Sequence, residues 1–496
     1  MDYCKEELLF RRQFILTKKP KKLKNWQQTH LFDDYYLYNH PDLKKVDMSL
    51  DGKRAILLGF AIDPDHIDYN DFDILRDILE KSDNFKEFQE NTLSLTARWI
   101  MFFIGDDERK VFSDPATTRQ IYYSTKDELI IGSDPNIINY FLEHPKNDDP
   151  CYLEYINSKF YKINEVEWYS DKTAYKDIKK LLPNHYYDLS TRQSKRFWID
   201  VKYLDYKKTI DRVTDLLVNS FRALDKRDYD KFLALTAGFD SRVIYAASSY
   251  SNIDCKYFLS TMNQLKTSHP DFAIAQKILA DDNKYLIILD NLDNLSDDFI
   301  YYYKKNISQS QILPKTLTAQ ELLKNPNFPA NTMLITGNAS AVFKDYYKKS
   351  SAKTGKEIAK LTGIPKKYPI FDQEFDEWIL ENKKLIEENQ INMMDLFYWE
   401  HRLANFGIKY VANQDIAVDE FAAFNNREIF LLLMKAKYIN KIDHTKIFTD
   451  IINKLNPRLM TYPINPAENS KKALANTVKN KISKRNWEYI KLLLKK

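Results

Sequence analysis

One stretch of the sequence, residues 231–247, constrains the fold of this chain more than any other. Residues 232–235 are apolar in a row, which is typical of a strand covered on both faces. A short polar loop, residues 236–242, comes next, and the apolar run at residues 243–247 predicts a helix after it. This arrangement suits a phosphate group, because the free amides and the positive dipole end of the helix face the loop.

Three residues of the loop have side chains, or lack one, in a way that suits an anion site. Gly238 has no side chain and lets the backbone come close to an anion. Asp240 or Ser241 is predicted to cap the following helix. The loop has no Gly-Lys-Ser/Thr and has one glycine rather than three, so it is neither a Walker loop nor a dinucleotide fingerprint. An ordinary strand-to-helix turn of an α/β domain is the alternative.

The segments around the loop alternate between strand and helix patterns. The expected helices are residues 206–224 and 270–280, and the expected strands are residues 254–259, 284–289 and 332–336. This alternation predicts an α/β doubly wound parallel sheet, with ligands at the carboxyl ends of its strands. The last part of the chain is predicted to be helical and to begin with a helix at residues 393–405.

Residues 1 to about 200 show a different, β-rich pattern. Strands are expected at residues 54–60, 99–104, 110–112, 120–124 and 128–131, with a helix at residues 136–143. A chain of 496 residues is long enough for two or three domains. We therefore predict an α+β domain at residues 1–200 and an α/β domain at residues 201–496.

Charge and cysteine content exclude several classes of protein. The 75 basic and 70 acidic residues nearly balance, which argues against a nucleic-acid partner. No apolar run approaches the length of a membrane span. Cys4, Cys151 and Cys255 are widely spaced and the eight histidines are scattered, so neither a metal site nor a disulfide framework is expected. These features together predict a cytoplasmic protein.

The loop resembles the pyrophosphate loop of the asparagine synthetase family, whose usual form is Ser-Gly-Gly-Xaa-Asp-Ser. Thr236 stands for the first serine and Ala237 for the first glycine, and Gly238, Asp240 and Ser241 match. The resemblance implies that this loop, together with the adjoining Arg242, binds the phosphates of ATP. It also implies catalytic roles for Asp240 and Ser241, and a Mg²⁺ ion held by Asp240.

The same resemblance extends the site to three other places. Thr261 and Met262, at the end of the second strand, lie where the family holds adenine. Asp271 occupies the place of an acidic residue early in the next helix, although a first-turn helix charge is an equal interpretation. Gly337 matches the second glycine-containing motif of the family, Ser-Gly-Glu-Gly-Ser-Asp-Glu.

This second motif lacks its acidic residues in the present chain. Asn338, Ala341 and Val342 stand where the family has Glu, Asp and Glu. A carboxylate there helps to bind Mg²⁺ and steers the attacking amine. Either another residue supplies that charge or catalysis is impaired; Asp345 is near in sequence but comes two to four positions late.

The N-terminal domain resembles the glutamine-hydrolysing amidotransferase domain of the same family in the order of its segments. In the family an N-terminal cysteine is the nucleophile, and its terminal amine assists the thiol. This chain begins Met1-Asp2-Tyr3-Cys4, so we interpret Cys4 as an ordinary small apolar residue and predict no glutaminase activity. β-Lactam synthetases and lasso-peptide cyclases belong to the same superfamily and also lack the cysteine.

Two late segments complete the resemblance. Residues 421–430 are similar to the segment that organises the helices beside the active site, and we predict a structural ion pair for Arg427. The family has a late lysine that contacts pyrophosphate, and Lys471 and Lys472 are the candidates here.

The function implied by the resemblance is that of an ATP-dependent ligase. It activates a carboxylate as an acyl-adenylate, releases pyrophosphate and forms an amide with an amine, and it has no nucleic-acid or membrane partner. The alternative is a degenerate homologue that binds a nucleotide or a partner and forms no amide. The intact loop favours the ligase, and the missing acidic residues favour the alternative.

Overall fold

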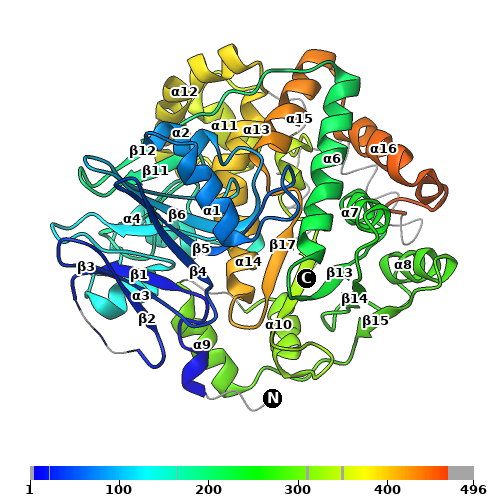
Figure 1. Cartoon of the computed structure of the whole chain (residues 1–496), viewed down its shortest axis with the longest axis horizontal. Coiled ribbons are helices and arrows are strands. Elements are labelled where there is room, and N and C mark those ends of the chain that lie inside the picture. The colour runs from blue at the N-terminus through cyan, green and yellow to red at the C-terminus, as the bar shows by residue number, and fades with distance from the viewer. Residues whose placement is uncertain are drawn as a thin grey trace.

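The computed structural model describes residues 5–19, 21, 23–164, 166–308, 312–347 and 351–466. Its N-terminal half contains two six-stranded antiparallel sheets (Figure 1). The first sheet has the order β10 (Ile178–Lys180), β8 (Tyr122–Ser124), β9 (Ile131–Gly132), β1 (Phe14–Thr17), β3 (Tyr35–Asn39) and β2 (Gln27–Phe32). The second has the order β12 (Gln193–Arg196), β11 (His185–Asp188), β7 (Arg109–Ser113), β6 (Thr96–Ile104), β5 (Lys53–Ile62) and β4 (Lys45–Leu50).

Strand β5 shows how these sheets form layers. Its side chains alternate between two apolar clusters, as the period of a strand requires. Ile56 and Leu58 pack between the two sheets. Ala55 and Leu57 pack on the other face of the strand, under helices α1 (Asp71–Glu80) and α2 (Phe85–Glu90). Helix α3 (Pro135–Phe141) covers the outer face of the first sheet, so the antiparallel sheets and helices expected of an α+β fold are confirmed for the N-terminal part.

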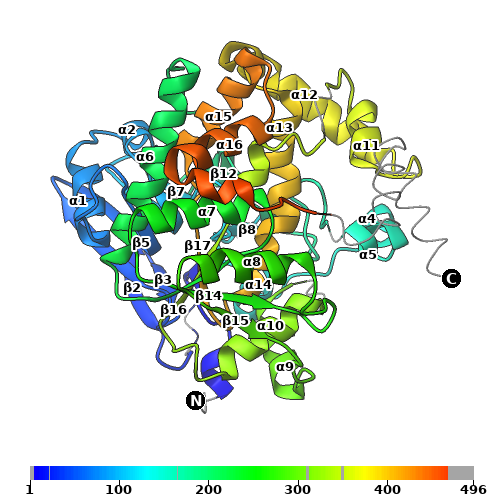
Figure 2. The same cartoon turned by 90° about the vertical axis from the view of Figure 1, so that its right-hand side faces the viewer.

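The second half contains one five-stranded sheet in which all neighbours are parallel. Its order is β15 (Leu286–Leu289), β14 (Lys256–Ser260), β13 (Asp230–Ala234), β16 (Thr332–Thr336) and β17 (Asp419–Ala422). Leu233 packs on the face covered by α6 (Tyr206–Asp225), α7 (Phe239–Tyr250) and α8 (Pro270–Asp281), of which Figure 2 shows α7 and α8 in front of the sheet. Phe232 packs on the opposite face, under α9 (Asp297–Asn306) and α10 (Pro314–Lys324). The predicted doubly wound parallel sheet is confirmed.

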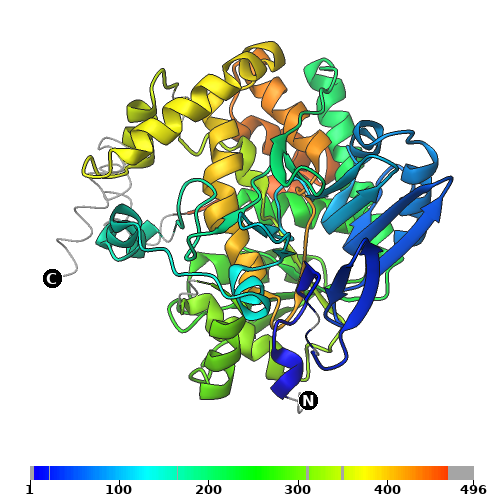
Figure 3. The same cartoon turned by 90° about the vertical axis from the view of Figure 1, so that its left-hand side faces the viewer.

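The C-terminal part is helical, as expected, but the expected helix at residues 393–405 is longer and irregular. It consists of α13 (Met393–Phe397), a π-helical stretch (Tyr398–Gly407) and α14 (Ile408–Gln414), and this helix runs through the middle of the molecule in gold in Figure 3. The remaining helices are α4 (Pro150–Ile156), α5 (Lys159–Asn164), α11 (Gly355–Thr362), α12 (Ile370–Asn389), α15 (Arg427–Asn440) and α16 (His444–Leu455). None of the helices among the described residues has the length and apolarity that crossing a membrane requires.

Buried charges join the two halves. Arg98 on β6 is fully buried and donates hydrogen bonds to Asp415 at 2.8 Å and to Asp419 at 2.6 Å. Arg119 forms ion pairs with the same two carboxylates. The predicted domain boundary at residue 200 stays a prediction, but the side chains on its two sides share one ionic cluster.

A short N-terminal segment, residues 8–13, is held by the second half of the chain. The amide of Phe10 donates to Asn306 Oδ1 at 2.6 Å, and Gln13 Nε2 donates to the Asn306 carbonyl at 2.8 Å. Arg11 donates to the carbonyl of Ile416, and Arg12 to that of Asp415. The segment before β1 therefore belongs to the interface between the halves.

Asp134 lies at this interface, and its burial is expected to make the stability of the protein depend on pH. Its Oδ1 accepts the amides of Asn136 at 2.8 Å and Ser308 at 2.9 Å, and burial raises its pKa to about 7. The folded chain thus keeps a proton that the unfolded chain loses near pH 4. We expect the free energy of unfolding of the wild type, relative to Asp134→Asn, to fall by up to about 1.4 kcal/mol per pH unit between about pH 4 and 7. Urea unfolding across this range measures the difference.

The exposed turn residue Asp51 supplies the control, as Asp51→Asn. Wild type and Asp134→Asn curves that run parallel between pH 4 and 7 would contradict the raised pKa of the buried carboxyl.

Candidate functional site

Two loops meet at the carboxyl ends of β13 and β16, where the strand order of the parallel sheet reverses. Ligands of doubly wound sheets bind at such a point. The approach is close: a Cβ added to Gly337 would lie 2.7 Å from Asp240 Cβ and 3.0 Å from the Asp240 carbonyl carbon. Gly337 is therefore the residue that lets the second loop pack against the first turn of α7.

The first loop is closed by its own side chains. Ser241 Oγ accepts the amide of Thr236 at 3.0 Å and lies 2.9 Å from Thr236 Oγ1. Thr236 Oγ1 also accepts the amide of Gly238 at 3.2 Å. Asp271, in the first turn of α8, accepts the amide of Ala237 at 2.9 Å. Of the predicted residues, Thr236, Ala237, Gly238, Ser241 and Asp271 thus come together. Asp271 shapes the loop through a hydrogen bond.

Helix α7 begins earlier than the sequence pattern indicates. It starts at Phe239, and its N-cap is Gly238, which offers no side-chain hydrogen bond. The prediction that Asp240 or Ser241 caps the helix is wrong, because both lie inside its first turn. In the described part of the chain, the amides of Phe239, Asp240 and Ser241 have no acceptor, as the first amides of an uncapped helix do not. These amides can bind an anion.

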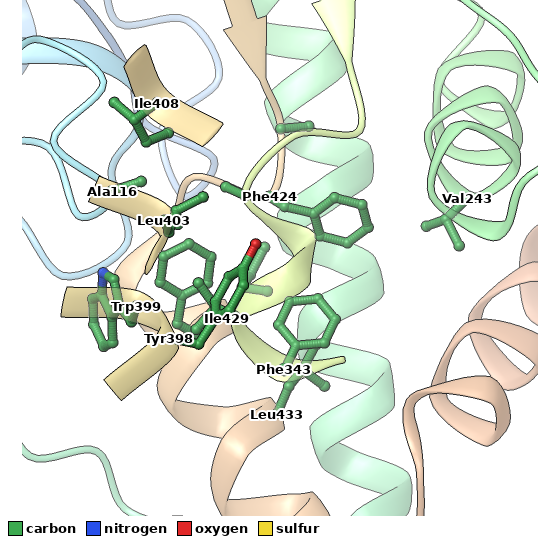
Figure 4. Close-up of a cluster of buried hydrophobic side chains, with 14 of the residues drawn as sticks. Ala116, Val243, Phe343, Tyr398, Trp399, Leu403, Ile408, Phe424, Ile429 and Leu433 are labelled. Carbon is green, nitrogen blue, oxygen red and sulfur yellow. The ribbon is translucent and has the colours of Figure 1, made fainter. Parts of the chain in front are cut away.

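The Asp240 carboxylate carries two partners from the segment after β16. Ser340 Oγ donates to Asp240 Oδ1 at 2.9 Å, and Lys344 Nζ forms an ion pair with Oδ2. Phe343, between these two residues, packs against Phe424 with ring centroids 5.7 Å apart, and Figure 4 shows the two rings in one buried cluster. This packing fixes the position of the segment.

Three other predicted binding residues form hydrogen bonds with the protein itself. Thr261 is fully buried, and its Oγ1 donates to Asp290 Oδ1 at 2.9 Å. Met262 has a φ of 52° in the adjoining turn, and its amide donates to Ser260 Oγ. The Arg242 guanidinium is buried and donates to the carbonyls of Leu459, Tyr462, Pro463 and Ala237. Burial lowers the pKa of Arg242 to about 10. In this structure Arg242 holds the backbone of residues 459–463 in place.

The protein ligands expected for Mg²⁺ are incomplete. Asp345 forms a buried ion pair with Lys437 at 2.9 Å, and Lys437 also pairs with Asp395. Residues 5–466, apart from their gaps, contain no group of three or more His, Cys, Asp or Glu side chains that could hold a metal ion. Asp240 is the one carboxylate of the first loop, and both of its oxygens are occupied. The described residues therefore do not form a Mg²⁺ site from protein ligands alone.

The sequence did not single out three residues of this site. Besides Lys344, Glu420 on β17 is buried and accepts hydrogen bonds from Thr336 Oγ1 at 2.7 Å and Asn338 Nδ2 at 2.6 Å. Burial raises the pKa of Glu420. The amide of Asn465 donates to the Ala237 carbonyl at 3.2 Å. A glutamate within the short apolar stretch of β17 is the one local signal that could have marked Glu420.

Other predictions fall outside the site. Lys471, Lys472 and Cys4 lie outside the described residues. Arg427 has no ion pair within the described residues, so the ion pair predicted for it is wrong there. Its guanidinium donates to Asn184 Oδ1 and lies over the rings of Phe197 and Trp399.

Comparisons with known proteins leave the chain without a family. No protein-family model and no curated protein matches it. Among solved structures, the chain is similar to the allosteric regulatory enzyme of purine biosynthesis (10% identity, TM-score 0.25). It is also similar to glutamine phosphoribosylpyrophosphate amidotransferase from B. subtilis complexed with ADP and GMP (9% identity, TM-score 0.24). Each match covers 51% of this chain and spans only 60% of the other. With TM-scores below 0.5, neither match bears on the activity.

Proposed function

We propose that this protein is an ATP-dependent carbon–nitrogen ligase that activates a carboxylate as an acyl-adenylate. The observation that carries the proposal is the meeting of the loops after β13 and β16, with the acceptor-free amides of Phe239, Asp240 and Ser241 at their junction. Loops at this point of a doubly wound sheet suit a nucleotide, and helix amides suit its phosphates.

In the proposed reaction a substrate carboxylate attacks the α-phosphorus of ATP. The bond from this phosphorus to the β-phosphate bridging oxygen breaks, and pyrophosphate leaves. The first-turn amides of α7 would hold the departing pyrophosphate as its charge develops. An amine then attacks the acyl carbon, AMP leaves with the bonding electrons, and the amine proton is lost to solvent. Because the described residues form no Mg²⁺ site from protein ligands alone, Mg²⁺ would arrive bound to the triphosphate of ATP.

We propose that the N-terminal half takes no part in glutamine hydrolysis. A nucleophile of the expected kind needs a free N-terminal amine beside its thiol. The segment that enters β1 is instead buried between the halves through Phe10, Arg12 and Gln13. The amine would therefore come from a substrate, and the near balance of basic and acidic residues argues against a nucleic-acid partner.

Two measurements test the ligase. Calorimetry with ATP and Mg²⁺ measures nucleotide binding by the folded protein. Exchange of labelled pyrophosphate into ATP, with a panel of amino acids, peptides and sugar acids, measures adenylation of a carboxylate. We expect saturable ATP binding and exchange that depends on one class of carboxylate. A folded protein that binds no ATP at millimolar concentration would refute the proposal.

The second candidate is a homologue that binds a nucleotide without making an amide. The neutral side chains of Asn338, Ala341 and Val342 favour it, because they supply no carboxylate to steer an amine. ATP binding without pyrophosphate exchange, for any carboxylate of the panel, would select this candidate.

A substitution of Gly238 tests the approach of the phosphate to the backbone. The residue has a φ of −79°, and a Cβ there would have Asn465 Oδ1 and Thr236 Oγ1 at 3.4 Å, so alanine fits the folded chain. We expect Gly238→Ala to cost about 1 kcal/mol of stability or less and to weaken ATP binding by more than about tenfold, since the methyl group faces the loop. Calorimetry and thermal unfolding measure both effects. Unchanged ATP affinity would place the phosphates elsewhere.

A further inference from the structure

We propose that Lys344 replaces a protein-held metal ion at this site and supplies the positive charge that lets the loop bind a pyrophosphate group. This role rests on the proposed phosphate site. The resemblance to the asparagine synthetase family assigned no role to Lys344. It follows from the poor fit of Mg²⁺ described above.

The contacts of Asp240 define the position of this charge. Lys344 Nζ occupies Oδ2 and Ser340 Oγ occupies Oδ1, which are the two atoms that a metal ion would use. Both partners come from the turn after β16, Ser340–Phe343, and from the residue that follows it. An ammonium group at this place carries the charge of a cation without needing further carboxylates.

The electrostatics of α7 require such a charge. Asp240 lies in the first turn, beside the amides that would bind the phosphates. A bare carboxylate there would repel an incoming phosphate. The Lys344 ammonium neutralises the Asp240 carboxylate, so this negative charge no longer offsets the attraction of the helix dipole for the phosphates.

The side chain of Lys344 is also placed to contact the ligand directly. It is 25% exposed, and the side chain of Asp240 is 31% exposed, so solvent reaches the pair. The Lys344 ammonium lies 5.8 Å from the centre of the Phe448 ring, and Phe448 packs against Phe343 and Phe424. The Phe448 ring faces the ammonium group, whose three N–H donors can be shared between the carboxylate and a phosphate oxygen.

The test measures pyrophosphate binding by calorimetry, once in EDTA and once with Mg²⁺. The variants are Lys344→Met, which keeps an unbranched apolar stem, and Lys344→Arg, which keeps the charge. Lys360→Met, at an exposed lysine of α11, is the control. We expect the wild type and the control to bind pyrophosphate in EDTA, and Lys344→Met to bind about 10- to 100-fold more weakly, the loss of one charge-assisted contact. Lys344→Arg should restore most of this loss.

Asp240→Asn separates the two roles of the carboxylate. If Lys344 is the working cation, this variant keeps metal-free pyrophosphate binding, because the ammonium is released to the ligand. If Asp240 works as a metal ligand, the variant loses binding that depends on Mg²⁺. This variant retains the size and the hydrogen-bond acceptor of Asp240.

Each outcome decides between the claims. Lysine-dependent pyrophosphate binding in EDTA without ATP binding would support the role of Lys344 and refute the ligase. A wild type that binds no pyrophosphate, or binds it only with Mg²⁺, would overturn the role of Lys344. Equal or tighter metal-free binding by Lys344→Met would overturn it as well, and would show that the lysine blocks the site.

Discussion

Replacing Arg98 with methionine is expected to lower the free energy of unfolding by about 3–5 kcal/mol, the usual cost of removing one partner from a buried ion pair. Arg98 is 0% exposed and donates to Asp415, to Asp419 and to the Thr118 carbonyl at 3.0 Å. The substitution leaves two buried carboxylates with Arg119 and Arg12 as the nearby cations. Urea unfolding monitored by circular dichroism measures the loss.

The matched control is Arg54→Met, which removes a bidentate ion pair with Asp47 whose side chains are about one quarter exposed, at 25% and 26%. We expect a loss of about 1 kcal/mol or less there. If both variants lose the same free energy of unfolding, the buried ionic cluster stabilises the contact between the halves no more than an exposed ion pair stabilises the surface.

The Arg98 variant should also change the response to acid. Burial alone would raise the pKa of Asp419, but Arg119, Arg98 and Arg12 hold it well below its usual range. This depressed pKa adds stability above about pH 4, and the stability is lost as the pH falls further. We expect Arg98→Met to flatten the acid limb of the stability curve.

Replacing Gly337 with alanine is expected to weaken ATP binding by more than about 30-fold. The new methyl group would overlap the Asp240 Cβ at 2.7 Å and crowd the Ser241 amide at 3.3 Å. The two loops must then separate, which moves the first-turn amides of α7 away from the phosphates. Overpacking of this kind costs about 1–3 kcal/mol of stability, so calorimetry should be performed well below the unfolding temperature.

Gly105→Ala is the control for this substitution. Gly105 lies in a turn of the N-terminal half, and the nearest atom to its added Cβ is Phe103 Cε1 at 3.4 Å, an ordinary contact. We expect no change in ATP affinity. A Gly337→Ala variant that binds ATP within threefold of the wild type would show that the junction of the loops does not carry the site.

The parallel sheet could be predicted from the sequence because its central strands are short apolar runs between polar turns. The runs of apolar residues at 232–235 and 332–336 are enough by themselves to predict buried strands. Strand β17 was missed because Asp419 and Glu420 interrupt its apolar pattern. Both carboxylates are satisfied by side chains far away in the chain, Arg98 and Thr336. The π-helical turns at residues 398–407 leave no trace in residue spacing.

The site was predictable in part for the same reason. The contacts among Thr236, Gly238 and Ser241 lie within six residues, and the sequence pattern contains them. The ion pair of Asp240 with Lys344 joins positions 104 residues apart, and only the fold brings them together. Arg242 is the opposite case. Its position in the motif suggested a contact with the ligand, but its guanidinium donates hydrogen bonds to backbone carbonyls of residues 459–463.

The burial of residues 8–13 has a consequence for synthesis on the ribosome. Arg11 and its acceptor at Ile416 are 405 residues apart in the sequence. At about 5–20 residues per second, the ribosome needs roughly 20–80 s to translate the intervening chain. During that interval the N-terminal sheets can form, but residues 8–13 lack the surface that covers them in the finished protein. A nascent chain stalled before Asn306 lacks all of these acceptors and therefore presents this segment to proteases, whereas the completed chain hides it.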